Sequence, residues 1–335
     1  MKKRLFGRID GRPVEEVTLE SADAAVSILS FGATVRDWRV DSAGRSLPMV
    51  LGFPTLDDYL EHARSHGAVV GRVANRTADA SFELDGRIWH LDANDGRHHL
   101  HGGSLGIGRR IWAMEAGGVA EAVHLEYLSP DGEMGYPGEV RFTVTYRLEG
   151  PRLVVEMEGH PDRPTPINLV QHSYYNLAGG ADVRDHVLRI AAEQYTPVDD
   201  EGIPAGTIEP VAGTRYDFRR PVSFEESDPE RKGVDINFVL DPARDRDEPS
   251  VEVVSDWTNR RLRLWTHEPG LQVFNTPRQE IAAEGHDRQR YGRFSGLCLE
   301  PQHFPDSLHH PDWPSIIRSP EEPYRQRLVV EIDRA

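Results

Sequence analysis

The stretch that decides the fold class is Val140-Arg-Phe-Thr-Val-Thr-Tyr-Arg-Leu148. Apolar or aromatic residues alternate along it with polar ones, and several of its side chains are β-branched. Successive side chains of a strand point to opposite faces, so this alternation predicts a strand with one buried face. β-branched and aromatic residues also suit a pleated surface.

Shorter runs of the same kind recur along the whole chain, and each ends at Gly, Pro, Asn or Asp. Leu84-Asp-Gly-Arg87 predicts a tight hairpin turn, because Asp-Gly readily adopts the left-handed conformations that such turns need. The best helical candidate is short, residues 55–62, with Thr55 as its cap. The other predicted strands are Val17–Leu19, Ala25–Leu29, Ala68–Val70, Ser81–Leu84, Val123–Tyr127, Leu153–Glu158, Ile167–Val170, Val251–Val254, Leu262–Thr266, Leu271–Phe274 and Leu328–Ile332.

We find no low-complexity linker, no short repeat and no shift in composition along the chain. The acidic segment 241–249 is interpreted as an exposed loop. A chain of 335 residues can bury a large core. We therefore expect an all-β protein, a large antiparallel β-sandwich that forms one domain over residues 1–335.

The composition limits the classes of partner. The chain carries 55 acidic and 39 basic residues, a formal net charge of −16, which argues against nucleic acid or an anionic membrane as a partner. No apolar run is long enough to span a membrane, and we expect no signal peptide because no apolar segment follows the basic N-terminal residues. Cys298 is the only cysteine, which excludes an intramolecular disulfide and favours a cytoplasmic location.

One carboxylate stands inside an apolar segment, Ser295-Gly-Leu-Cys-Leu-Glu-Pro-Gln-His-Phe-Pro305. The run predicts a buried strand in which Cys298, Glu300 and Gln302 share a face. An ionised Glu in such a place is costly unless it is paired, hydrogen-bonded or facing water. Glu300 is therefore either part of a buried ion pair or a catalytic carboxylate on a rigid strand.

Three histidines lie close together in His98-His-Leu-His-Gly-Gly103. The spacing His99-x-His101 on a strand is compatible with metal binding, but no acidic ligand follows in the glycine-rich segment after it. We therefore expect no metal. We interpret His101 as a hydrogen-bonding group beside two glycines that let a small ligand approach the main chain.

Further polar residues stand at predicted strand ends. Asn75 and Arg76 follow one such strand, and Asp235 precedes another, where it could also simply cap a turn. In Asn168–Asn176, alternation would place His172 and Tyr174 on one face of a strand.

Together with Glu300, these groups favour acid–base chemistry on a small neutral substrate. No phosphate cradle, dinucleotide fingerprint or serine nucleophile motif is present, so we expect no cofactor.

At these residues the chain resembles the aldose 1-epimerase (galactose mutarotase) family. The resemblance covers nearly the whole length, and its strength lies in several motifs that occur in the family's order. The motifs are Phe31-Gly-Ala-Thr34 with Val50-Leu-Gly-Phe53, Gly71-Arg-Val-Ala-Asn-Arg76, Leu100-His-Gly-Gly103, Asp131-Gly-Glu-Met-Gly-Tyr-Pro-Gly138, Gln171-His-Ser-Tyr-Tyr-Asn-Leu177 and Leu299-Glu-Pro-Gln302.

The resemblance implies a β-supersandwich and a cofactor-free interconversion of the α and β anomers of a free aldose. By position it implies that Glu300 is the general base, that His172 is the general acid and that His101 polarises the ring oxygen. The sugar-binding positions that it implies are Asn75, Arg76, Asp235 and Gln272. The segment Leu271-Gln-Val-Phe-Asn-Thr-Pro277 departs from the commoner family pattern, and Tyr175 replaces a commoner Phe.

Three other functions remain open at this stage. A glycoside hydrolase would use Glu300 and Asp235 as its two carboxylates. A sugar-phosphate epimerase would need basic residues for the phosphate, and Arg109 with Arg110 is the conspicuous pair. A non-catalytic sugar-binding protein would need no acid–base pair. For any of these we expect a small-molecule ligand and a monomer or homodimer.

Overall fold

The regular structure of the protein is almost entirely β. The computed structural model describes residues 3–42, 44–63, 65–117, 122–180 and 182–335. The α-helices in these ranges are short, α1 (Leu56–Glu61) and α2 (Phe224–Ser227), and none is long and apolar enough to cross a membrane. The 3₁₀ turns are η1 (Ala78–Ala80), η2 (Ile107–Arg109), η3 (Glu133–Gly135), η4 (His286–Arg288) and η5 (Ser307–His309). The expected all-β class is confirmed.

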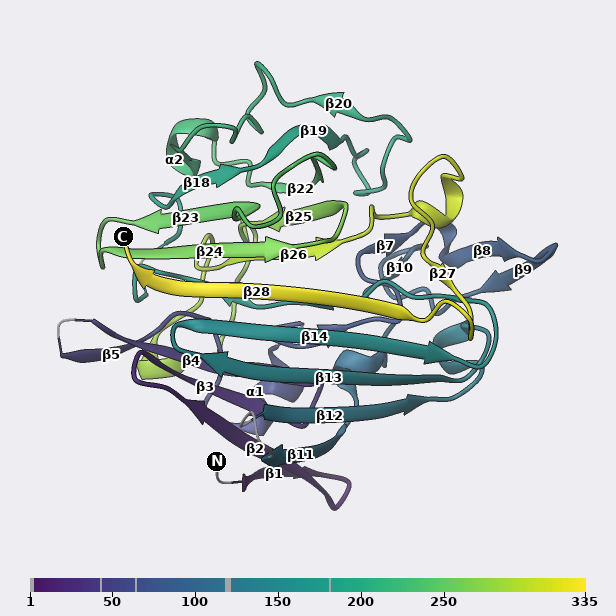
Figure 1. Ribbon diagram of the computed structural model, residues 1–335, viewed down its shortest axis with the longest axis horizontal. Coiled ribbons are helices and arrows are strands. Elements are labelled where there is room, and N and C mark those ends of the chain that lie inside the picture. Colours follow the sequence, from purple (N-terminus) through teal and green to yellow (C-terminus); the bar gives the residue numbers. More distant parts are fainter. Residues whose placement is uncertain (1–2, 43, 64, 118–121, 181) are drawn as a thin grey trace.

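The largest sheet has nine strands, and its neighbouring strands are antiparallel. In Figure 1 it crosses the view, with the first strand near the bottom. In spatial order its strands are β11 (Ala113–Gly117), β12 (Ala122–Ser129), β13 (Val140–Glu149), β14 (Arg152–Pro161), β28 (Tyr324–Arg334), β24 (Arg260–Thr266), β23 (Val251–Ser255), β18 (Val187–Ile190) and β21 (Val222–Ser223).

Two further sheets complete the sandwich. A five-stranded meander contains β1 (Lys3–Ile9), β2 (Arg12–Glu20), β3 (Ala24–Leu29), β4 (Thr34–Ser42) and β5 (Arg45–Pro48). A six-stranded sheet has the order β17 (Tyr174–Tyr175), β26 (Leu297–Gln302), β25 (Gly270–Phe274), β22 (Asp235–Leu240), β19 (Ala192–Thr196) and β20 (Glu209–Pro210).

Four short pairs of strands lie outside these three sheets. They are β6 (Val69–Val70) with β16 (Val170–Gln171), β7 (Arg76–Thr77) with β10 (His99–Leu100), β8 (Ser81–Leu84) with β9 (Arg87–His90), and β15 (Thr165–Pro166) with β27 (Ile317–Arg318). The β8–β9 hairpin turns at the predicted Asp-Gly, with Leu84 paired to Arg87.

The hydrophobic core lies between the layers. One continuous cluster joins Trp38 of the five-stranded sheet, Phe142 and Tyr146 of the nine-stranded sheet and Leu271 of the six-stranded sheet. Phe142 and Tyr146 are the inward residues of β13, whose burial alternates as its sequence predicts. Burying one large apolar side chain contributes about 1.5–3 kcal/mol, so this shared core holds the three sheets together.

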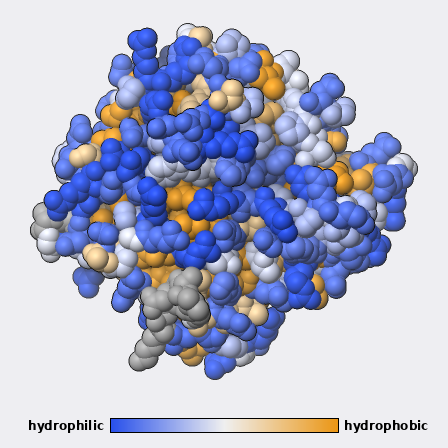
Figure 2. All heavy atoms as spheres, viewed as in Figure 1, coloured by the Kyte–Doolittle hydropathy of each residue, from blue (hydrophilic) through white to orange (hydrophobic). Residues whose placement is uncertain are grey.

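The outer face of the nine-stranded sheet is dominated by charged side chains. Figure 2 shows this face mostly hydrophilic, with some apolar surface near its centre. Arg147 on β13 pairs with Glu156 on β14 at 2.8 Å, and Arg263 on β24 pairs with Asp333 on β28 at 2.9 Å. Pairs at the surface contribute about 0.2–1 kcal/mol each, so these partly exposed pairs make the face polar more than they stabilise the fold.

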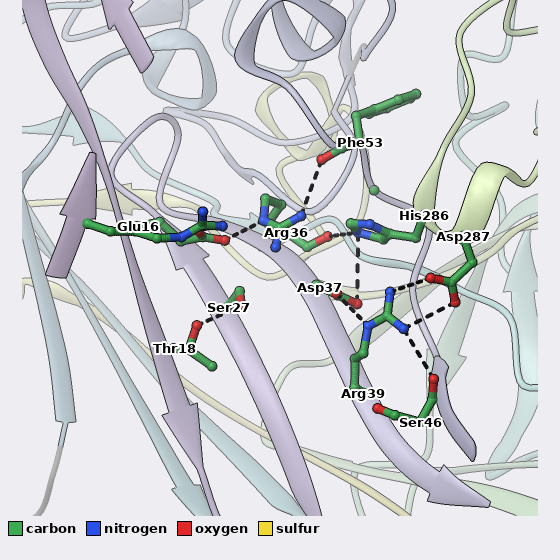
Figure 3. Close-up of polar contacts among 12 residues, drawn as sticks. Glu16, Thr18, Ser27, Arg36, Asp37, Arg39, Ser46, Phe53, His286 and Asp287 are labelled. Atoms are coloured by element: carbon green, nitrogen blue, oxygen red, sulfur yellow. Dashed lines mark hydrogen bonds and ion pairs between the residues drawn. The ribbon is translucent and has the colours of Figure 1, made fainter. Parts of the chain in front are cut away.

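The long loop between β25 and β26 is held against β4 (Figure 3). His286 Nε2 lies 2.8 Å from the main-chain oxygen of Arg36 and donates to it. The Arg39 guanidinium bonds Asp287 at 3.0 and 3.1 Å, and its Nε bonds Asp37 at 2.8 Å. These contacts fix the loop that leads into β26.

The strand structure expected over residues 167–176 is wrong, and of the expected strand Ile167–Val170 only Val170 lies in a strand. Residues 168–176 do not form a continuous strand with alternating faces; β16 pairs with β6, β17 pairs with β26, and His172 and Ser173 lie between them. Because the segment changes partner sheets within a few residues, both of its faces are buried. The helix α1, by contrast, begins after Thr55 as predicted, and the Thr55 side chain accepts a bond from the Asp58 amide.

Candidate active site

Glu300 lies in the interior of β26, as the apolar run around it predicts. Its side chain is 2% exposed, and every residue of β26 is buried. Its Oε2 has no hydrogen-bond partner among the described residues. Burial raises the pKa of Glu300 well above its usual 4.5, and the nearby charge of Asp235 raises it further. No arginine or lysine is within ion-pair distance of this carboxylate in the described part of the chain. The interpretation of Glu300 as half of a buried ion pair with such a residue therefore has no support.

A row of polar side chains crosses the six-stranded sheet beside Glu300. Asn237 of β22, Gln272 of β25 and Glu300 of β26 are register partners and therefore share a face. Asp235 stands two residues before Asn237 on the same face, and Gln272 Nε2 donates to its Oδ1 at 2.6 Å. Asp235 is exposed, so the row reaches solvent at this end. Desolvation by the surrounding protein nevertheless raises the pKa of Asp235.

His172 faces Glu300 from the junction of β16 and β17. Its main chain is fixed on both sides, because its amide donates to Ala68 O at 2.8 Å and its carbonyl accepts from the Gly67 amide at 2.8 Å. Its Nε2 lies 3.6 Å from Glu300 Oε1. Burial lowers the pKa of His172 to about 4, partly offset by a contact with its own main chain. A neutral imidazole therefore sits close to a carboxyl group whose charged form is also disfavoured.

His101 follows β10 and is held by Asn75. The His101 amide donates to Asn75 O at 3.0 Å, and the Asn75 amide donates back to His101 Nδ1 at 3.2 Å. Because Nδ1 accepts this hydrogen bond, the neutral ring carries its proton on Nε2, which can donate. Burial lowers the pKa of His101 well below 6.5, with further contributions from His172 and Arg76. His101 is therefore a neutral hydrogen-bond donor at physiological pH.

The turn after His101 depends on Gly102. Its φ is +83°, and a Cβ built there would lie 1.7 Å from the main-chain oxygen of Gly71. A side chain at this position would push apart the segments that carry His101 and Asn75. The two glycines noted after His101 therefore allow close contact between protein segments.

Arg76 lies at the start of β7, with its side chain partly exposed. Its Nε donates to Asp95 Oδ2 at 2.8 Å, and its main-chain amide donates to Asn75 Oδ1 at 2.8 Å. A Cβ on Gly202 would lie 2.9 Å from its Nη1, so the loop that follows β19 passes close to the guanidinium. Asp95 thus fixes one side of the guanidinium fork.

The structure brings three of the predicted residues into one group, which we call the acid–base cluster: His101, His172 and Glu300. One side-chain nitrogen or oxygen from each lies within 4.8 Å of the other two. The rings of His101 and His172 meet edge to face, with centroids 5.1 Å apart. Such a donor set can also hold a metal ion. The hydrogen bond from the Asn75 amide to His101 Nδ1, however, leaves the proton of the neutral ring on Nε2, and a protonated nitrogen cannot bind a metal.

The neighbouring histidines do not join this cluster. His99 uses both ring nitrogens, Nδ1 at 2.7 Å from Asp92 O and Nε2 at 2.6 Å from the Tyr136 hydroxyl. His98 Nδ1 accepts from the Asp79 amide at 3.1 Å. The run His98–His101 therefore separates into two structural histidines and one at the site.

Sequence reasoning missed Asn237, Asp95 and His66. Asn237 belongs to the polar row, and its position two residues after Asp235 in a strand could have revealed it. Asp95 holds Arg76 from a loop, and no local pattern pointed to it. His66 stacks on Tyr174 behind His172, a contact that only the fold creates.

Comparison with known proteins supports a single family. The model of the family described as aldose 1-epimerase matches residues 15–331. Galactose mutarotase from Rattus norvegicus is 38% identical over 329 residues, with 96% of this chain and 95% of that protein covered. Aldose 1-epimerase from Escherichia coli strain K12 is 34% identical over 321 residues, with 91% and 90% covered.

Solved structures agree. An aldose epimerase homologue from C. elegans superposes with a TM-score of 0.90 at 26% identity, covering 96% of this chain and 99% of the other. Galactose 1-epimerase from Lactobacillus acidophilus gives a TM-score of 0.88 at 27% identity, covering 100% and 98%. With its β-sandwich, its ordered motifs and these relatives, the chain belongs to the aldose 1-epimerase family.

Proposed function

We propose that the protein is a mutarotase, an isomerase that interconverts the α and β anomers of a free aldose such as glucose or galactose by acid–base ring opening. The observation that carries this proposal is the acid–base cluster, in which Glu300, His172 and His101 converge from three separate segments of the chain. A carboxylate, an acid and a neutral donor around one point are what this reaction requires.

The reaction proceeds without change in oxidation state. Glu300 removes the proton of the anomeric hydroxyl while His172 protonates the ring oxygen, and the bond between C1 and the ring oxygen breaks. The open-chain aldehyde rotates about its C1–C2 bond. On closure His172 removes the proton from the attacking hydroxyl, and Glu300 returns a proton to the carbonyl oxygen. Each group ends as it began.

Burial determines where the single proton of this pair rests. It lowers the pKa of His172 and raises that of Glu300, so both charged forms are disfavoured and the neutral pair, carboxylic acid with imidazole, is the resting state. The pair holds one proton in both of its working states, as carboxylate with imidazolium or as carboxylic acid with imidazole. The first state serves the closed sugar and the second serves the aldehyde.

The remaining predicted residues surround this pair and suit sugar hydroxyls. His101 Nε2 donates to the ring oxygen and stabilises negative charge on it. Asp235 and Gln272 present a carboxylate and an amide on the same sheet face, and Gln272 Oε1 and Glu300 Oε2 are buried without partners in the described residues. Hydroxyl groups of a bound sugar would satisfy these atoms.

Asn75 and Arg76 complete the sugar site from the other side. With Nε engaged by Asp95, the Arg76 guanidinium can present its terminal nitrogens to sugar oxygens. Asn75 shapes the site mainly through its main-chain bonds to His101.

The alternatives have less support. A sugar-phosphate epimerase needs cations for the phosphate, but Arg109 bonds the carbonyls of Leu60 and Ala63, and Arg110 bonds Glu133. A glycoside hydrolase acting through Glu300 and Asp235 leaves His172 and His101 without a role. A sugar-binding protein without catalysis has no need for the acid–base cluster.

Polarimetry on freshly dissolved α-anomers of glucose, galactose, xylose and arabinose tests the proposal. We expect the protein to accelerate the change of optical rotation for at least one sugar, and to do so equally after dialysis against a strong chelator. A rate equal to the buffer blank for all four sugars would refute mutarotase activity. Loss of activity on chelation, restored by zinc or manganese, would make the acid–base cluster a metal site.

We also propose a cytoplasmic monomer or homodimer that binds neither nucleic acid nor membranes. The single, buried cysteine and the net charge of −16 support this assignment. Sedimentation equilibrium would determine the oligomeric state.

A further inference from the structure

A column of stacked rings stands behind the acid–base cluster. Tyr174 lies parallel to His66, with ring centroids 3.9 Å apart and planes 4° from parallel. Tyr174 also stacks on His172, with centroids 5.0 Å apart and planes 18° from parallel. Two rings this close and this parallel cannot share one face of Tyr174, so it lies between the two imidazoles. Phe53 closes the far end by an edge contact with His66 at 5.4 Å.

The imidazole of His172 depends on this column for its orientation. A catalytic histidine is usually oriented by a hydrogen bond to its second ring nitrogen. His172 Nδ1 is buried, and no other described residue bonds it; the ring also contacts the main chain of His172 itself. The main-chain bonds to Ala68 and Gly67 fix the Cα but leave the ring plane free to rotate. In the described residues the ring stacks on Tyr174 and makes an edge-to-face contact with His101.

We propose that Tyr174 is a positioning residue for the reaction, whose ring face sets the plane of the His172 imidazole and favours the imidazolium that donates the proton. The electron-rich face of a tyrosine attracts a cation that lies over it, most strongly where water is excluded. This inference rests on the proposed role of His172 as the acid. It adds a group that touches neither substrate nor the reacting atoms.

His172 also contacts its own main chain, which raises its pKa and does not involve Tyr174. The other described groups around His172 do not stack on its ring. Glu300 lies at the opposite ring nitrogen, Nε2, where it exchanges the proton. His101 is neutral and meets His172 edge to face, and a positive charge on either histidine disfavours a positive charge on the other. Asp235 acts on Glu300, and Arg76 acts on His101. Among the described residues, Tyr174 is the one ring that stacks on His172.

Two substitutions at Tyr174 separate the ring from its hydroxyl. Tyr174→Phe keeps the stacked face, and we expect it to keep at least about half of the wild-type kcat. Tyr174→Leu removes the face, and we expect kcat to fall about tenfold while KM changes less than about twofold, because the imidazolium is needed in the transition state. Should the leucine variant fail to fold, Tyr174→Met replaces it as a ring-free variant with a more adaptable side chain.

Phe53→Leu is the matched control. Phe53 is a fully buried aromatic of the same column, and losing it costs comparable packing without touching His172. We expect its kcat to stay near the wild-type value. If Phe53→Leu loses as much kcat as Tyr174→Leu, the column has only a general structural role and the proposal is overturned.

A titration of His172 followed by its Cε1–H resonance gives a readout independent of activity. We expect its pKa to fall in Tyr174→Leu and to stay unchanged in Tyr174→Phe and Phe53→Leu. An unchanged pKa in a folded leucine or methionine variant would overturn the proposal, as would an unchanged kcat. If the wild-type protein accelerates no aldose, the mutarotase assignment fails, and the titration still decides whether Tyr174 stabilises the imidazolium.

Discussion

Removing the charge of Glu300 while keeping its shape isolates its role as a base. Glu300→Gln retains the size of the side chain within β26, and we expect mutarotation to fall about 10²–10⁴-fold, the usual contribution of a positioned general base. The fold should survive, because an amide costs less to bury than a carboxylate without a basic partner. Polarimetry gives the rate and circular dichroism checks the fold. A folded variant with more than about half of the wild-type rate would exclude Glu300 as the base.

His172 and Arg76 are expected to affect different kinetic constants. His172→Asn removes the group that protonates the ring oxygen, which matters most in the transition state, so kcat should fall more than KM rises. Arg76→Ala removes a sugar-holding group that acts on ground and transition states alike, so KM should rise more than in His172→Asn. Initial rates over a range of sugar concentrations separate the two. The reverse pattern would mean that Arg76 acts mainly in catalysis and that His172 mainly holds the sugar.

The pH dependence follows from the single proton of the Glu300–His172 pair. Below about pH 4 His172 also takes a proton, Glu300 is already protonated, and the base is lost. Above the raised pKa of Glu300 the pair has lost its last proton, and the acid is lost. His101 is neutral near pH 7, because burial lowers its pKa well below 6.5. We expect kcat/KM, corrected for the blank, to trace a bell whose acid limb lies near pH 4. An acid limb at the ordinary histidine pKa of about 6.5 would contradict this.

At the scale of elements, the local pattern was a good guide wherever a strand or turn is determined by its own residues. β13, the β8–β9 turn, α1 and β26 with Glu300 all follow from alternation, Asp-Gly, a Thr cap and an apolar run. The segment around His172 failed because its two short strands are defined by partners in β6 and β26, far away in sequence. The sequence pattern contains no information about that change of partner.

The histidine run shows the same limit. His99 is hydrogen-bonded to Asp92 and has a structural role, whereas His101 lies in the site. The two differ because the main chain leaves the strand at His101, where φ is 52°. The cluster itself was predictable only through the family resemblance, since its members come from segments whose proximity is a property of the sandwich. Individual strands could be inferred from their own residues, but the way in which the fold brings His101, His172 and Glu300 together could not.

The turn after β10 offers a test of how strongly an element constrains the site. Gly102→Ala would place a methyl group 1.7 Å from Gly71 O at a φ of +83°. We expect a loss of more than about 1 kcal/mol in the free energy of unfolding and a fall in kcat, because the turn carries His101. Gly86→Ala is the control: its φ of +71° is equally strained, but no atom lies within 4 Å of the added carbon.

Urea unfolding and polarimetry on both glycine variants separate backbone strain from displacement of the site. Gly86→Ala should lose some stability and keep its activity. If Gly102→Ala behaves in the same way, the close approach of Gly71 does not position His101.

At the scale of the whole molecule, net charge distinguishes a neutral sugar from a phosphorylated one. The chain carries a formal charge of −16, and a long-range field acts on the encounter rate of charged ligands only. Raising the salt concentration from about 0.01 M to about 1 M shortens the screening length from about 30 Å to about 3 Å. For a free aldose we therefore expect kcat/KM to change less than about twofold over this range.

A sugar phosphate would give the opposite result. Its negative charge is repelled by the acidic protein, so screening should speed its encounter, whereas salt would weaken any direct contact between its phosphate and an arginine. Sodium chloride series with the α-anomer of glucose and of glucose 6-phosphate, each corrected for its own blank, make the comparison. A salt-independent rate with glucose and little activity on the phosphate supports a site built for neutral hydroxyls. A higher kcat/KM for the phosphate at every salt concentration would instead favour the sugar-phosphate epimerase and require a cation beside the polar row of Asp235 and Gln272.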